Sequence, residues 1–334
     1  MKNDMFDLVS YSIKCDKLKL GEKKQVILIA DLHNYFRNKN KAKSLVSYIK
    51  TRNPHHIVIA GDIIQGKKWE SEKVLSSLKS FLNDLSSVAP VFMCLGNHDL
   101  VGQNDNRINN FKSLKVEGKV YPLTNDIITY DGFDIIGYNP KREVYNLGLQ
   151  EHGIAHDMFI KDFMEHGVKI LNSKNIIEFV GHSPYLFAVS ENSIGLEELN
   201  KVDSFLVGHM HNGYKRSSTV KNNPDKYLDY GFVERSYSYN KDGKLCKFNP
   251  LFFSKTPLCR GVGYIDKNSK VKIIELRNNH FYMNNKPILE SEALKIIKKN
   301  NYHPMVITGG IRKFFGFSLF GDKPEITEVI YENN

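Results

Sequence analysis

The apolar positions of this chain form short continuous runs that alternate along the sequence with segments in which apolar residues have helical spacing. Short apolar runs rich in β-branched residues occur at residues 25–33, 55–64, 90–99, 176–184 and 203–211. Runs of this length predict strands that are buried on both faces of a sheet. The period-two alternation at residues 9–15 instead predicts an edge or half-buried strand.

Helical spacing separates the first three of these runs. Residues 39–52 place apolar side chains at i, i+3, i+4 and i+7, and residues 71–88 do the same, with Ser71 positioned to cap the helix. A third helix is expected within residues 155–170. Strands that alternate with helices predict an α/β fold whose sheet is largely parallel and crossed by helices.

After residue 213 the pattern becomes rich in turn residues. Residues 270–278 and 326–333 still predict strands, and residues 291–300 predict a helix. The positive charge is also concentrated in this part: residues 1–213 carry a net charge of +1, and residues 214–334 carry +9. A basic segment favours anionic partners such as phosphate esters, nucleic acid or acidic lipid heads, although a solvated lysine-rich surface would give the same count.

Composition places the chain among soluble proteins. Apolar residues make up 41% and charged residues 25%, which is an ordinary globular balance. The sequence shows neither a long uncharged apolar run nor a signal-peptide pattern at its start. We therefore expect a cytoplasmic protein. Its four cysteines show no CxxC spacing, which argues against a thiolate zinc site.

Polar groups that can bind metals follow each of the five buried strands. They are Asp31, His33, Asp62, Asn97, His98, Asp99, His182, His209 and His211. Because ligands of open α/β sheets bind beyond the carboxyl ends of the strands, these groups should converge at one edge. Burying so many polar groups without partners would be costly, and metal coordination removes that cost. Nitrogen and oxygen donors suit Mn²⁺, Fe²⁺ or Zn²⁺, and their number suits two ions that share a carboxylate.

These residues form five blocks with a characteristic order. "DLH" (31–33), "GD" (61–62), "GNHD" (96–99), "GH" (181–182) and "GHMH" (208–211) resemble the signature of the calcineurin-like metallophosphoesterases. The resemblance implies a four-layer α/β/β/α sandwich with a dimetal site at the carboxyl ends of its strands. It also implies one domain over residues 1–334, with the motif-bearing core at 24–213 and a variable basic part at 214–334 that completes the second sheet.

The resemblance also assigns a role to each residue. One metal would bind Asp31, His33 and His211, and the other would bind Asn97, His182 and His209, with Asp62 bridging the two. His98 would face the substrate phosphate, Asp99 would orient His98, and a metal-bound hydroxide would be the nucleophile. We expect two divalent ions (Mn, Fe or Zn), and Mn²⁺ is the ion we expect to support activity in vitro.

Two departures separate the chain from the purple acid phosphatases. Those enzymes have a tyrosine where this chain has Gln65, and they lack a histidine at the position of His33. Residues 8–34 and 306–333 are instead similar to the leading and closing segments of the branch with bacterial phosphodiesterases and UDP-2,3-diacylglucosamine pyrophosphatase-like enzymes.

Three functions remain open from the sequence. The favoured one is a phosphodiesterase or pyrophosphatase that acts on a small or lipid-linked phosphoester. A nuclease of the DNA-repair type shares the motifs, and the basic C-terminal part allows nucleic acid as a partner. A non-catalytic scaffold with this fold is the third, but the chain keeps the full ligand set. No obligate protein partner is evident.

Several other residues are weaker candidates. Arg107 and Tyr214 lie near motif blocks and could touch a phosphate, while His55 and His56 are expected to be surface or packing residues. Residues 311–321 hold four phenylalanines beside two cations: Phe314, Phe315, Phe317 and Phe320 with Arg312 and Lys313. They predict either core of the second sheet or a lip for peripheral contact with an anionic membrane.

Overall fold

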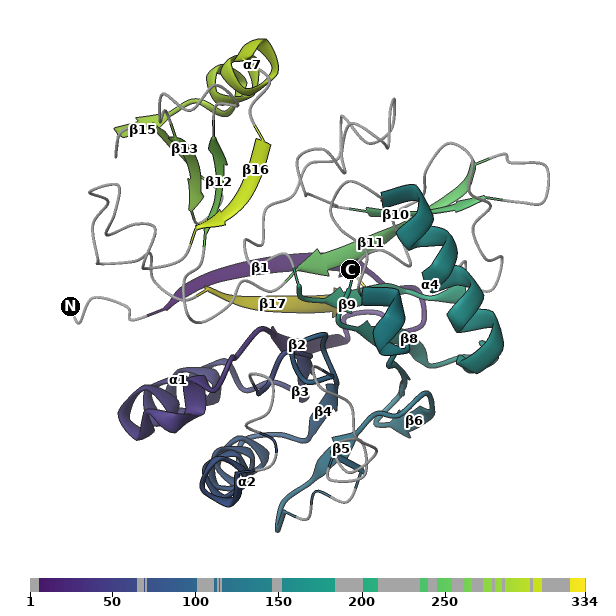
Figure 1. The fold of residues 1–334 in the computed structure, drawn as a ribbon. Helices are drawn as coiled ribbons and strands as arrows, with labels where there is room; N and C mark the ends of the chain where they lie inside the picture. Colours follow the sequence, from purple (N-terminus) through teal and green to yellow (C-terminus); the bar gives the residue numbers. More distant parts are fainter. Residues whose placement is uncertain are drawn as a thin grey trace.

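Two six-stranded sheets form the body of the protein (Figure 1). In the computed structural model, the described residues are 6–64, 69, 71–100, 111–112, 114, 116–145, 152–183, 201–209, 235–239, 245–253, 261–265, 273–277, 280–283, 286–300, 303–307 and 325–333. The first sheet has the order β1 (Asp7–Lys14), β17 (Glu325–Glu332), β2 (Lys23–Ile29), β3 (His56–Ala60), β4 (Val91–Cys94) and β5 (Val120–Pro122). The second has the order β10 (Arg235–Tyr239), β11 (Leu245–Phe253), β9 (Ser204–Val207), β8 (Ile176–Gly181), β7 (Phe133–Tyr138) and β6 (Ile127–Tyr130).

The strands that carry the motif blocks are parallel within each sheet. β2, β3 and β4 pair in parallel in the first sheet, and β7, β8 and β9 pair in parallel in the second. Their carboxyl ends therefore meet at one edge of each sheet, where the blocks begin.

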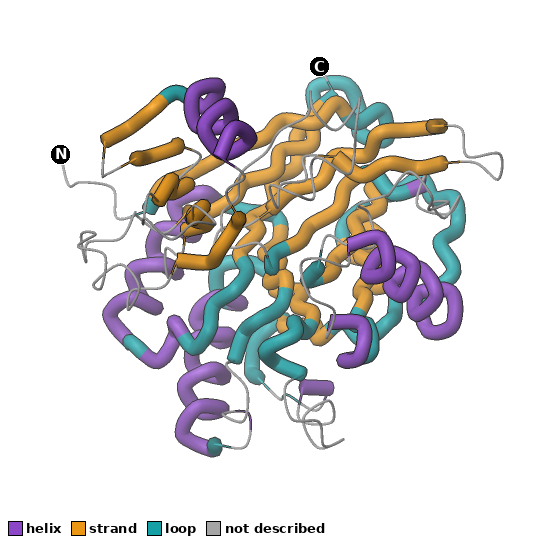
Figure 2. Tube along the Cα trace, turned by 45° about the horizontal axis from the view of Figure 1, so that its top comes forward, coloured by secondary structure: helices purple, strands orange, loops and turns teal. Residues whose placement is uncertain are grey.

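The helices lie outside the two sheets, and apolar cores fill the space between layers (Figure 2). α1 (Lys39–Arg52) and α2 (Glu72–Ser86) bury residues such as Leu45 and Phe81 against the first sheet. Residues of both sheets, among them Val58 and Phe133, form a second core between the sheets. On the far side, α4 (His152–His166) packs Phe163 against Phe179 of the second sheet, with ring centroids 5.6 Å apart. The predicted four-layer α/β/β/α sandwich is confirmed.

The C-terminal part contributes to three sheets. β10 and β11 extend the second sheet, whereas β17 lies inside the first sheet between β1 and β2. A third sheet has the order β15 (Lys286–Ile288), β14 (His280–Met283), β13 (Ile273–Arg277), β12 (Gly261–Ile265) and β16 (His303–Ile307). The helix α7 (Glu290–Asn300) connects two strands of this third sheet.

The predicted helices agree with the structure, and the strand predictions are incomplete. Helices were expected at 39–52 and 71–88, and α1 and α2 occupy these ranges. Ser71 is the N-cap residue of α2, although its side chain makes no capping hydrogen bond. The strands β5, β6 and β7 had no prediction. Among the described residues, no helix is long and apolar enough to cross a membrane.

A buried polar network joins the two sheets at the amino end of β3. His56 Nε2 lies 2.7 Å from Glu178 Oε2, and both side chains are fully buried. Tyr331 of β17 donates its hydroxyl hydrogen to the other oxygen of Glu178, at 2.7 Å. His56 is thus a packing residue, as expected, but its ring also makes a hydrogen bond with a buried carboxylate.

Candidate metal centre

The motif blocks meet because their loops continue the pairing of the strands. Beyond the ends of β2 and β3, Asp31 N donates to the carbonyl of Gly61 at 3.0 Å, and His33 N donates to that of Asp62 at 2.9 Å. In the second sheet, Gly208 N donates to the carbonyl of His182 at 2.9 Å. Each sheet therefore presents its blocks side by side at the same edge.

One contact fastens the loops of the two sheets to each other. The backbone N–H of His209 donates to both carboxylate oxygens of Asp31, at 3.2 and 3.1 Å. Asp31 is fully buried, so this contact is shielded from water. The dimetal site predicted at the strand ends thus spans the edge where the two sheets face each other.

His182 is the centre of one ligand group. Its Nε2 lies 3.0 Å from Asn97 Oδ1, 3.3 Å from Asp62 Oδ2 and 4.0 Å from Asp31 Oδ1. His209 Nδ1 lies 3.3 Å from the same nitrogen. Three or more nitrogen and oxygen donors at such distances form the kind of cluster that coordinates a divalent first-row metal.

The tautomer of His182 suits this role. Its Nδ1 lies 2.8 Å from the carbonyl oxygen of Ala60, which can only accept, so Nδ1 carries the hydrogen. Nε2 then points at the carboxylates. Metal-binding histidines in proteins use this arrangement, in which the second ring nitrogen donates to a backbone carbonyl and fixes the orientation of the ring.

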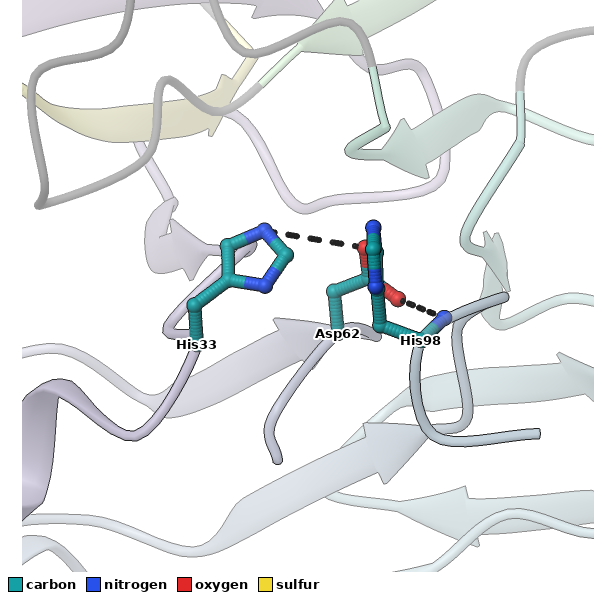
Figure 3. Close-up of side chains that lie close together, drawn as sticks. All are labelled: His33, Asp62 and His98. Carbon is teal, nitrogen blue, oxygen red and sulfur yellow. Dashed lines mark hydrogen bonds and ion pairs between the residues drawn. The ribbon is translucent and has the colours of Figure 1, made fainter. Parts of the chain in front are cut away.

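A second ligand group contains His33, Asp62 and His98 (Figure 3). One ligand atom from each of these residues lies within 4.8 Å of the others. His33 Nε2 is 3.7 Å from Asp62 Oδ2, and the rings of His33 and His98 meet edge to face, with centroids 4.9 Å apart. His98 is half-buried, and its backbone N–H donates to Asp62 Oδ1 at 2.7 Å, which links its loop to Asp62.

Asp62 belongs to both groups. The His182 group contains Asp31, Asp62 and His182, and the His33 group contains His33, Asp62 and His98, so the carboxylate of Asp62 is shared by the two sets of donors. Burial alone would raise the pKa of Asp62, but His182, His98 and His33 hold it well below its usual range. The same pairing works in the other direction: burial would lower the pKa of His182, but Asp62 and Asp31 raise it to about 9.

Strained backbone marks the same residues. Asp31, His33, Asp62 and His209 have φ angles of 53°, 43°, 51° and 71°, in the left-handed region that side chains with a Cβ rarely adopt. Each such residue costs on the order of 1–3 kcal/mol. Strain of this kind persists only where surrounding structure enforces it, and it gathers at functional sites.

Two of the block glycines are required for close packing. A Cβ on Gly96 would lie 2.3 Å from both the backbone nitrogen and Oδ1 of Asp62, and one on Gly208 would lie 2.8 Å from Asp31 Oδ2. Neither residue has a positive φ. These glycines make room for the carboxylates.

Asp99 holds the loops of two blocks together. Its Oδ1 accepts from Ile64 N at 2.7 Å and from Trp69 Nε1 at 3.1 Å. Its Oδ2 accepts from Ile63 N at 3.1 Å and from Gly96 N at 2.8 Å. The orientation of His98 by Asp99 stays a prediction.

Two residues of this region carried no signal in the sequence. Trp69 is the single tryptophan of the chain, is buried, and binds Asp99 through its indole N–H. Tyr145 places its ring beside His182 and His209, with both centroid distances at 6.1 Å. No motif contains either residue. His211, Gln65, Arg107 and Tyr214 lie outside the described residues.

The residues present fit two divalent metals. The donors are imidazoles, carboxylates and one amide, and a shared aspartate links the two groups. Asp62 Oδ2 is buried and makes no hydrogen bond with a described residue, although two imidazole nitrogens face it. A bridging cation pair would satisfy such an oxygen, because carboxylates that are buried are normally paired or bound to metal.

Comparison with known proteins agrees with this site. Residues 24–213 match the family model of the calcineurin-like phosphoesterases. No curated protein sequence matches the chain closely enough to count as a relative.

Three solved structures are similar to parts of the chain. A phosphopantetheinyl hydrolase from Mycobacterium tuberculosis has 16% identity and a TM-score of 0.34, and the match covers 58% of this chain and 85% of that one. A dimetal phosphatase from Danio rerio has 11% identity and a TM-score of 0.32, with coverage of 85% and 98%. A nuclease from Pseudomonas putida has 9% identity and a TM-score of 0.27, with coverage of 77% and 86%.

The family match covers more than half of the chain and contains all five motif blocks. The family is dimetal-dependent, and the shared aspartate provides for two ions. The chain belongs to the calcineurin-like phosphoesterases and is a metal-dependent hydrolase of phosphoric esters.

Proposed function

We propose that the chain hydrolyses a phosphodiester or a pyrophosphate bond in a small or lipid-linked substrate. The observation that carries this proposal is the position of Asp62 in both ligand groups. A shared carboxylate suits two ions held close together, which is the arrangement that clamps a phosphoryl group during hydrolysis. When bound, such ions act as Lewis acids on phosphoryl oxygens and lower the pKa of water.

The residues of the chain would have two roles: binding the metals and contacting the phosphoryl group of the substrate. Asp31, His33, Asp62, Asn97, His182 and His209 would hold the metals, together with His211, and Mn²⁺ is the ion we expect to support turnover in vitro. His98 lies beside His33 in the group of His33, Asp62 and His98, and it is half-buried. This position supports a role in which its ring faces the phosphoryl group, stabilises the developing charge or protonates the leaving oxygen.

The decisive experiment is turnover with added metal against a panel of substrates. The panel contains monoesters, the diester bis-p-nitrophenyl phosphate, nucleotides, sugar-nucleotide pyrophosphates and a short DNA duplex. We expect hydrolysis of the diester or of a pyrophosphate with Mn²⁺, and its loss on chelation. No turnover of any phosphoester with Mn²⁺, Fe²⁺ or Zn²⁺ would overturn the proposal.

The DNA arm tests the nuclease alternative, which the charge of +9 over residues 214–334 favours. Cleavage of DNA with a steep decrease at higher salt would select that alternative, because binding to the phosphate backbone releases counterions. Cleavage of small diesters at a rate insensitive to salt would favour the small-molecule substrate.

The lipid-linked substrate and the peripheral membrane contact depend on residues 311–321, which lie outside the described residues. Co-sedimentation with anionic vesicles tests this contact. Binding that is unchanged by Phe314→Ala with Phe317→Ala would remove the membrane-lip hypothesis.

A further inference from the structure

Tyr145 lies against the metal centre without belonging to any motif. It ends the short helix η3 (Arg142–Tyr145), which follows β7. Its ring centroid is 6.1 Å from the rings of both His182 and His209. On its other side, the ring meets Phe159 of α4 edge to face at 5.4 Å. The phenol therefore forms a wall on the His182 side of the centre.

The hydroxyl group of this residue lacks a hydrogen-bond partner among the described residues. Tyr145 as a whole is half-buried, but its hydroxyl oxygen is buried and makes no hydrogen bond with a described residue. Buried hydroxyl groups in folded proteins are nearly always hydrogen-bonded. Tyr138 shows the usual case, because its buried hydroxyl donates to Asp162 Oδ2 at 2.8 Å.

A tyrosine phenol is protonated at neutral pH, since its ordinary pKa is about 10. A protonated phenol is a hydrogen-bond donor and a poor metal ligand. The partner that suits this hydroxyl is therefore an acceptor that enters the metal centre.

We infer that Tyr145 donates a hydrogen bond to a phosphoryl oxygen of the bound substrate on the His182 side of the centre. This inference rests on the proposed phosphoester hydrolysis. The oxygens of a phosphate ester are strong acceptors, and hydrogen bonds to charged oxygens are stronger than neutral ones. A neutral donor is well placed here, since the carboxylates around the site repel an anionic substrate.

The test compares Tyr145→Phe with the wild type and with Tyr138→Phe as a matched control. Each protein is loaded with Mn²⁺, and its metal content is measured. Two quantities are then determined: kcat and KM for bis-p-nitrophenyl phosphate, and the Kd of inorganic phosphate by calorimetry. Tyr145→Phe should retain its metals, weaken phosphate binding and lower kcat/KM, each by about tenfold or more. Tyr138→Phe should change neither quantity, although it loses a buried hydrogen bond.

Each other outcome counts against the inference. Phosphate affinity and kcat/KM within about twofold of the wild type would show that the hydroxyl touches no substrate oxygen. Loss of metal in Tyr145→Phe, or a visible charge-transfer band with Fe³⁺ that this variant removes, would make Tyr145 a metal-site residue instead. A wild type that binds phosphate but hydrolyses no ester contradicts the proposed function alone. In that case the Kd of inorganic phosphate for Tyr145→Phe, compared with that of the wild type, still tests the inference about Tyr145. A wild type that does not bind phosphate overturns both.

Discussion

Asp62 Oδ2 and His182 Nε2 lie 3.3 Å apart in a fully buried pair that joins the two sheets. Asp62 follows β3 of the first sheet, and His182 follows β8 of the second. His33 approaches the same oxygen at 3.7 Å. A single carboxylate oxygen is thus the point at which donors from both sheets meet, and the first prediction concerns its charge.

Asp62→Asn should empty the metal centre while the chain still folds. The amide keeps the size of the side chain but removes the negative charge and one acceptor atom, so neither group retains its shared anionic ligand. We expect the metal content to fall by at least about one ion per chain, and kcat to fall by about 100-fold or more. Metal analysis and diester turnover measure both. Asp84→Asn, at an exposed position of α2, is the control that should retain both.

His98→Ala should separate chemistry from metal binding. If His98 faces the phosphoryl group, its loss should lower kcat by about 10²–10⁴-fold, as expected for the removal of a general acid. The metal content should stay at the wild-type level, which distinguishes this variant from Asp62→Asn. Full activity with a normal metal content would show that the assigned role is wrong, and a loss of metal would make His98 a ligand of the His33 group.

Gly96→Ala and Gly181→Ala form a matched pair of added methyl groups. At Gly96 the new Cβ would lie 2.3 Å from the backbone nitrogen of Asp62, whereas at Gly181 its nearest neighbour would be Phe179 Cε1 at 3.5 Å. Gly96→Ala should therefore lower the free energy of unfolding by about 1–3 kcal/mol and reduce metal content. Gly181→Ala should stay within about 0.5 kcal/mol of the wild type. Chemical denaturation measures the free energy of unfolding, and metal analysis measures the metal content. Equal losses in Gly96→Ala and Gly181→Ala would refute the close-packing explanation.

The sequence was informative where apolar strand runs end in polar blocks. Parallel pairing of buried strands forces their carboxyl ends to one edge, so the convergence of Asp31, Asp62 and His182 could be predicted before the structure. The assignment of individual ligands came from the family resemblance. In the third sheet only β13 lies within a predicted strand, at residues 270–278, because the other four strands are segments of three to five residues. Such segments are too short to show a clear period-two alternation.

The groups that hydrogen-bond to the motif residues or pack against them could not be predicted in the same way. The carbonyl of Ala60 that fixes His182 is backbone and leaves no signature in the side chains. Trp69 and Tyr145 come from segments without hydrophobic periodicity. The family resemblance assigned Asp99 the orientation of His98, which stays a prediction. The four hydrogen bonds that Asp99 accepts from Ile63, Ile64, Trp69 and Gly96 had no signal in the sequence.

Asp99→Asn should destabilise the loops around the metal centre. The carboxylate accepts two N–H groups on each oxygen, and an amide turns one of these oxygens into a donor that faces two donors. We expect a loss of about 2–3 kcal/mol in the free energy of unfolding. Trp69 fluorescence reports unfolding in this variant, since it is the only tryptophan.

Trp69→Phe, followed by circular dichroism, is the matched test of one of these four hydrogen bonds. It removes the indole donor and part of a fully buried ring, so it should cost about 1–3 kcal/mol. A neutral Asp99→Asn variant would show that the carboxylate does not hold the two loops together.

His56→Ala should be among the most destabilising changes away from the metal centre. It takes one hydrogen-bond partner from the fully buried carboxylate of Glu178, and removing the partner of a buried charged group costs about 3–5 kcal/mol. The double variant His56→Phe with Glu178→Leu removes both polar side chains and should recover most of this loss, because apolar groups of similar shape often replace such buried pairs without cost. Thermal and chemical denaturation measure both, and turnover per folded molecule should be unchanged because the network lies at the amino end of β3. If the double variant is as unstable as the single one, cavity formation rather than an unpaired charge explains the effect.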